Sequence, residues 1–185
     1  MKSRFLIPML ALVILSMACK KSADSPGIDN STPRTNVPTA MQGEWLSGTF
    51  SMSEWWSYDG TQYQGNPYER SVAFNLSPNG NAEFYLAIAT FNGACRTEGF
   101  TYQKGTVAFN EAAHSFTFYP QQGNYRGLYS CTPGSNFDRD ALASELHAVT
   151  YYYSFETDEL GKEWMLIRFS ADESEYPSYF KETNW

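Results

Sequence analysis

Histidine and cysteine, the residues that most often build metal centres and nucleophilic active sites, are scarce in this sequence. Its 185 residues include two histidines, His114 and His147, and three cysteines. None of them falls in the CxxC or HxxxH spacing that zinc sites use. The sequence also lacks the GxSxG, HExxH, P-loop, GxGxxG and EF-hand motifs. We therefore expect no catalytic residue, no metal site and no cofactor, which argues against an enzyme.

Positive charge and long apolar runs are scarce as well. The chain has 13 Lys and Arg against 20 Asp and Glu, for a formal net charge of -7. An acidic surface repels phosphate backbones, so nucleic acid is not expected as a partner. Beyond the N-terminus no apolar run reaches the roughly 18 residues that a membrane-spanning helix needs, and no such helix is predicted.

The N-terminal residues 1–18 have the layout of a secretory signal peptide. Lys2 and Arg4 precede an apolar stretch that is too short to span a membrane. The small Ala18 followed by Cys19 resembles the lipobox of bacterial lipoproteins, and the Cys-Lys-Lys sequence is common among those of Bacteroidota. The resemblance implies that Cys19 is acylated after cleavage and holds the protein on a membrane, since several acyl chains bind firmly. The alternative is ordinary secretion with Cys19 as a free thiol.

The lipobox resemblance implies a cellular location for the protein. It implies an outer-membrane-anchored lipoprotein of the cell envelope, with the periplasmic or surface face left open. Residues 19–41 are rich in Ser, Thr, Pro, Asn and Asp, and such a composition predicts a disordered tether. Loss of the signal peptide takes the formal net charge from -7 to -9, because Lys2 and Arg4 leave with it.

Residues 42–185 have the size of one domain and the pattern of an all-β protein. In one run Phe84, Leu86 and Ile88 alternate with Tyr85 and Ala87, and similar alternation recurs in short runs separated by Gly, Pro, Asn and Asp. Aromatic residues make up 17% of the chain, which is enough for a substantial core. Many short alternating strands predict a sandwich or a barrel of antiparallel hairpins.

One segment breaks the two-residue period. Within residues 137–146, Leu142, Ala143 and Leu146 follow helical spacing, which predicts one short helix between strands.

The other two cysteines, Cys95 and Cys131, lie at the ends of predicted strands in the exported part of the chain. An oxidising compartment makes a disulfide between them the expected outcome.

A short motif resembles a known barrel family. Gly43 and Trp45 stand in the Gly-x-Trp spacing near the first strand, and Arg168 lies in the predicted last strand. This resembles the signature of lipocalins and other calycin-type barrels. The resemblance implies an up-and-down barrel of eight to ten strands, in which Arg168 packs across Trp45 at the closed end and excludes water there.

The strongest candidate for a binding surface is the aromatic stretch WWSYDGTQYQGNPY, residues 55–68. It contains Trp55, Trp56, Tyr58 and Tyr63 beside amide and carboxyl side chains. Exposed rings of this kind suit a rim that binds a glycan or a small apolar ligand at the open end of the barrel. The alternative is that the stretch folds against the barrel as a hydrophobic plug.

Two classes of function remain open from the sequence. The first is a membrane-anchored barrel that binds a small apolar ligand or glycan. The second is a protein-interaction module, an enzyme inhibitor or a scaffold with an envelope protein as its partner. They differ in the barrel interior, because a ligand binder needs a cavity whereas an interaction module can have a filled core.

Overall fold

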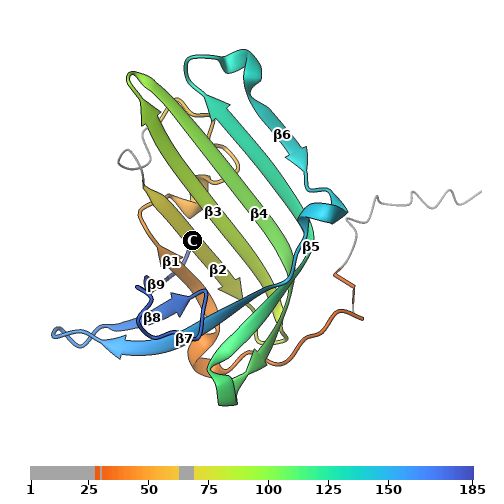
Figure 1. Cartoon of the computed structure of the whole chain (residues 1–185), viewed down its shortest axis with the longest axis vertical. Helices are drawn as coiled ribbons and strands as arrows, with labels where there is room; N and C mark the ends of the chain where they lie inside the picture. The colour runs from red at the N-terminus through yellow and green to blue at the C-terminus, as the bar shows by residue number, and fades with distance from the viewer. Residues whose placement is uncertain (1–27, 30, 63–68) are drawn as a thin grey trace, which may run out of the picture.

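The computed structural model describes residues 28–29, 31–62 and 69–185, which form an all-β structure (Figure 1). Residues 1–18, Cys19 and Tyr63 lie outside this described part. The strands are β1 (Gly43–Ser47), β2 (Arg70–Leu76), β3 (Asn81–Asn92), β4 (Cys95–Asn110), β5 (Ser115–Tyr129), β6 (Phe137–Asp140), β7 (Val149–Thr157), β8 (Glu163–Arg168) and β9 (Ser178–Thr183). The helical turns are 3-10 turns: η1 (Thr39–Met41), η2 (Met52–Glu54), η3 (Glu111–Ala113), η4 (Pro133–Ser135) and η5 (Ala143–Glu145).

The strands form one antiparallel sheet that closes on itself. Its order is β4-β3-β2-β1-β9-β8-β7-β5-β6, and an additional pairing of β4 with β5 closes a ring of eight strands. Strand β6 stays outside the ring, on the edge of β5. Neighbours in sequence are mostly neighbours in the sheet, as the hairpin pattern predicts. The predicted antiparallel up-and-down barrel of eight to ten strands is confirmed.

The barrel is longer on one side than on the other. Strands β3, β4 and β5 have 12, 16 and 15 residues, whereas β8 and β9 have six each. Strand β5 pairs with β7 only through Ser115–Phe118 and, farther along, with β6 through Asn124–Gly127. The ring therefore closes fully at one end, while at the other end β3, β4 and β5 project beyond the short strands (Figure 1).

Aromatic rings fill the closed half of the barrel. Phe74 is fully buried and meets the rings of Phe116, Tyr151 and Phe180 at centroid distances of 5.7, 5.3 and 5.7 Å. These residues come from β2, β5, β7 and β9, so one side chain links four strands across the interior. Tilted and edge-to-face arrangements of this kind add favourable electrostatics to the burial of apolar area.

The predicted tether is wrong for residues 33–41, which pack across the closed end of the barrel (Figure 1). Met41 is fully buried and Val37 is 3% exposed, both in the barrel core. The Thr35 amide donates to the Val107 carbonyl at 3.0 Å and the Val37 amide to the Pro78 carbonyl at 3.1 Å, so backbone hydrogen bonds hold this segment against the barrel. The average composition of the segment is polar and does not reflect its two buried apolar side chains. Their burial and the backbone hydrogen bonds offset the entropic cost of ordering the segment.

The predicted helix at 137–146 is much shorter than its spacing suggested. Its only helical part is the 3-10 turn η5, and its first residues form strand β6. The edge of β5 offers backbone partners there, and the Phe137 ring lies over Gly127, where an added Cβ would come within 2.3 Å of it. Leu142 is 62% exposed, so no apolar helix face has a core to bury against.

The predicted stacking of Arg168 on Trp45 is not present. Arg168 lies in β8, which is followed by β9, and its side chain donates to the Glu175 carbonyl and the Ser154 hydroxyl at 3.0 and 3.3 Å. Among the described residues no cation–ring contact joins it to Trp45. The Trp45 indole instead donates to the Met41 carbonyl at 3.1 Å, so the N-terminal segment closes this end of the barrel.

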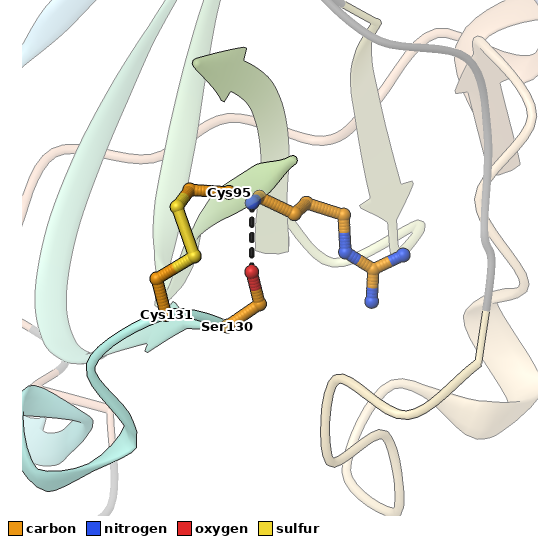
Figure 2. Close-up of a disulfide and its surroundings, with 4 residues drawn as sticks. Cys95, Ser130 and Cys131 are labelled. Carbon is orange, nitrogen blue, oxygen red and sulfur yellow. Dashed lines mark hydrogen bonds between the residues drawn. A yellow bond between two sulfur atoms is a disulfide. The ribbon is translucent and has the colours of Figure 1, made fainter. Parts of the chain in front are cut away.

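The disulfide between Cys95 and Cys131 is present and joins the start of β4 to the turn after β5 (Figure 2). Beside it the Arg96 amide donates to the Ser130 hydroxyl at 2.8 Å. The two cysteines are 36 residues apart in the chain. The bond thus ties together the ends of β4 and β5 that project beyond the closed part of the barrel.

Replacing both Cys95 and Cys131 with serine should lower the free energy of unfolding by about 3 to 4 kcal/mol. The bond restricts the unfolded chain over the loop that it closes, and its removal restores that entropy. Urea denaturation of the double variant and of the parent, in the absence of reductant, measures the difference. A change below about 1 kcal/mol would contradict the expected restriction.

Candidate functional site

An apolar cavity lies inside the open half of the barrel. Its volume is about 350 Å³, and its lining comes from β2, β3, β4, β5, β7, β8 and β9. The period-two pattern explains the lining, because Leu86 and Ile88 of β3 point into the barrel whereas Tyr85 and Ala87 pack on its outer face. The volume falls within the range of small-molecule sites.

The side chains that line the cavity are buried at its floor and exposed at its mouth. At the floor Phe74 is fully buried and Ile167 is 3% exposed, whereas at the mouth Ile88 and Phe169 are 41% and 57% exposed. The half-buried Leu86 lies between these two levels. Apolar side chains thus continue from the core to solvent, which is what an apolar ligand would meet on entering.

A small polar group lies in the cavity lining. Arg70 donates from Nη2 to the Ser178 hydroxyl at 2.9 Å. Burial raises the pKa of Tyr151 to about 12, and the nearby positive charge of Arg70 opposes that rise. Tyr151 therefore stays neutral at physiological pH, and its hydroxyl has no hydrogen-bond partner among the described residues. One cation and two hydroxyls are thus available to the polar end of a ligand.

The aromatic stretch does not form the predicted rim at the barrel mouth. Trp55 is 2% exposed and Tyr58 is 4% exposed, and both belong to a second apolar cluster on the outer face of β1–β4. Trp56 is 59% exposed on that same outer face, and Tyr63 lies outside the described residues. The rim prediction is wrong for Trp55 and Tyr58. The plug alternative fits their burial, but they cover the side of the barrel rather than its end.

Local backbone geometry directs the chain onto the outer face. Gly48, just after β1, has a φ of +106°, which favours glycine, and a Cβ there would come within 2.8 Å of the Ser71 backbone. The following residues therefore turn back across the sheet. Phe50 meets Trp55 at 5.2 Å and Phe100 of β4 at 5.5 Å, so the segment and the sheet share one aromatic cluster.

Charged groups hold this segment in place. Arg126 is 7% exposed, donates to the carbonyls of Trp55 and Tyr58, and lies 5.0 Å from the centre of the Phe100 ring. Tyr58 donates to Glu98 at 2.6 Å. Burial raises the pKa of the Glu98 carboxyl, and interactions with Tyr58 and with Arg96, which lies 3.1 Å from that carboxyl, oppose the rise. These contacts have a structural role, since they join the segment to the sheet.

The sequence had not singled out the residues that line the cavity. Leu86 and Ile88 fall in the alternating pattern that predicts a strand, and nothing in the sequence marks Arg70 or Phe169 as a binding residue. The sequence contains only part of the information needed to find the cavity. The alternation places Leu86 and Ile88 on one face of the strand but does not indicate which face lines a cavity. That depends on strand lengths and pairing, which leave this half of the barrel incompletely filled.

No helix in the described residues is long and apolar enough to cross a membrane. Across the ranges 28–29, 31–62 and 69–185, no group of three or more His, Cys, Asp or Glu is arranged to hold a metal ion. The sequence matches no protein-family model and no curated protein.

Proposed function

We propose that this chain is a lipocalin-like, membrane-anchored bacterial lipoprotein, of the kind found in Bacteroidota, that takes up a small apolar ligand in its barrel. The observation that carries the proposal is the cavity of about 350 Å³, whose apolar lining runs from a buried floor to an exposed mouth. Burial of apolar ligand surface there supplies the driving force. In this proposal the protein binds and carries the ligand without changing it chemically.

The polar part of the lining favours one kind of ligand. Arg70 offers a cation, and the other polar side chains of the lining are those of Thr101, Gln103, Tyr125, Tyr151 and Ser178, while most of the lining is apolar. A ligand with an apolar body and one hydrogen-bond-accepting or anionic end matches this distribution. The formal net charge would be -9 after signal-peptide cleavage, so Arg70 is a local positive charge in an otherwise acidic domain.

The interior favours ligand binding over the protein-interaction alternative. A module that only presents its surface to an inhibited enzyme or an envelope partner gains nothing from an unfilled core, since every unfilled volume costs packing energy. We expect a barrel to keep an unfilled interior, despite the lost packing energy, where a ligand occupies that interior.

The proposal is tested by titrating the protein with N-phenyl-1-naphthylamine, a neutral apolar fluorophore. We expect saturable binding of one probe molecule per chain, with enhanced fluorescence as the dye leaves water. Titration of the same protein unfolded in urea is the control for nonspecific association. Fluorescence that rises linearly without saturation would overturn the proposed function.

Membrane attachment is proposed to depend on Cys19 alone. The Cys19→Ala variant, expressed with its signal peptide, should move from the membrane fraction to the soluble fraction, because no other acylation site is predicted. Immunoblotting of separated fractions measures the shift, with the Cys95→Ser and Cys131→Ser double variant as a thiol control that stays on the membrane. Continued membrane retention of Cys19→Ala would contradict the lipid anchor.

A further inference from the structure

A second hollow lies on the outer face of the barrel and is separate from the cavity. This outer groove has a volume of about 490 Å³ and lies between Trp56, strands β4 and β5, and the residues around η5. Tyr102 of β4 lines it, whereas the neighbouring residues Thr101 and Gln103 line the interior cavity. Because successive side chains of a strand point to opposite faces, the sheet itself separates the two sites.

Trp56 forms a fixed aromatic platform in the outer groove. Its ring meets Tyr102 edge to face at a centroid distance of 5.1 Å, and the buried Arg126 guanidinium lies 5.5 Å from its centre. These two contacts hold the indole, yet 59% of Trp56 stays exposed. A neighbouring tryptophan, Trp55, is buried, so exposure of Trp56 is not the general condition of this segment. A held ring that remains accessible loses little entropy when a ligand stacks on it.

Amide and carboxyl groups lie around this platform. Asn124 donates to Asp138 at 2.7 Å, and Gln121 exchanges hydrogen bonds with the Asp29 backbone, which orients both side chains. Each carboxamide has two donor hydrogens and two acceptor lone pairs, so these bonds leave capacity for a ligand. The carboxylate of Asp140 also lines the groove. Leu146 supplies a further apolar contact there.

The chemistry of the lining selects the class of ligand. Among the described residues that line the groove there is a carboxylate and no lysine or arginine, so the lining does not favour an anionic ligand. A wholly apolar ligand would leave the amides and the carboxylate without partners. Rings that stack on apolar C–H faces, beside amides and a carboxylate that bond hydroxyls, match a neutral sugar. We propose that the outer groove binds a neutral oligosaccharide, with one sugar ring stacked on Trp56.

The test is isothermal titration calorimetry of the parent and three variants with four neutral probes: maltohexaose, cellohexaose, xylohexaose and hexa-N-acetylchitohexaose. We expect at least one of these to bind the parent, and Trp56→Ala to weaken that binding at least tenfold. The matched control is Tyr176→Ala, which removes an aromatic ring that is 96% exposed and does not line the groove, and it should bind as the parent does.

A second variant, Asp140→Asn, keeps the shape of the side chain and removes its charge; it should weaken binding of the same oligosaccharide by severalfold. Naphthylamine uptake by Trp56→Ala should equal that of the parent, which separates this proposal from the proposed function of the cavity. The outer-groove proposal is overturned if none of the four probes binds the parent, or if binding survives Trp56→Ala unchanged.

Discussion

The Trp55→Ala variant should lose about 3 to 5 kcal/mol of unfolding free energy, a large share of the total for a domain of this size. Trp55 is 2% exposed, and its ring lies 5.1 Å from Tyr85 and 5.5 Å from Phe100. Truncation would remove apolar contacts and leave a void between the 48–62 segment and the sheet. Arg126 would also lose one of the rings over which its buried guanidinium lies.

The neighbouring Trp56→Ala variant is the matched control for this prediction. It removes the same side chain one residue later, where more than half of it is exposed, and should cost about 1 kcal/mol or less. Urea denaturation of both variants and the parent, followed by far-ultraviolet circular dichroism, measures the two differences. Equal losses for Trp55→Ala and Trp56→Ala would show that the segment is not packed as described.

Obstruction of the cavity should have the largest effect on ligand binding. Leu86 points into the barrel between the buried floor and the exposed mouth, so Leu86→Trp places an indole in the space that the ligand needs. We expect naphthylamine affinity to fall at least tenfold while the unfolding free energy changes little, since the added ring enters an existing hollow rather than a packed core. Titration of the dye at equal protein concentration measures the change.

Two further variants keep this prediction testable. Glu159→Trp adds the same ring at an exposed position in the turn between β7 and β8, and should bind the dye as the parent does. If Leu86→Trp fails to fold, Val72→Phe narrows the same cavity from β2 with a smaller change. Unaltered affinity in a folded Leu86→Trp or Val72→Phe variant would place the dye elsewhere.

The alternation of side chains made the strands and their antiparallel hairpins predictable, because each strand has one face toward a core. It left a sandwich and a barrel open, and the lipocalin resemblance implied the barrel. The burial of Met41 and Val37 was not predictable from composition. These two apolar side chains, in a polar stretch of sequence, are buried only because they pack on the end of the barrel. The strands that form this end lie far away in the chain. Local patterns describe a segment's own preferences, whereas this packing depends on what the rest of the fold leaves uncovered.

The aromatic stretch shows the same limit in another form. Trp55 and Trp56 are adjacent and chemically identical, yet Trp55 packs between its own segment and the sheet whereas 59% of Trp56 is exposed. No pattern in the aromatic stretch distinguishes them. The disulfide between Cys95 and Cys131 was predictable, because the expected export and the number of cysteines left few choices. The cavity was not, because it arises from unequal strand lengths around the ring.

The location of a bound apolar molecule tests the central claim most directly. Nuclear Overhauser effects between N-phenyl-1-naphthylamine and the methyl groups of the protein would report which side of the sheet the dye contacts. We predict contacts with the methyls of Val72, Leu86 and Ile167, which line the cavity, and none with those of Leu46 and Leu128 in the outer cluster. Contacts with Leu46 and Leu128 alone would contradict the claim that the barrel interior is the binding site.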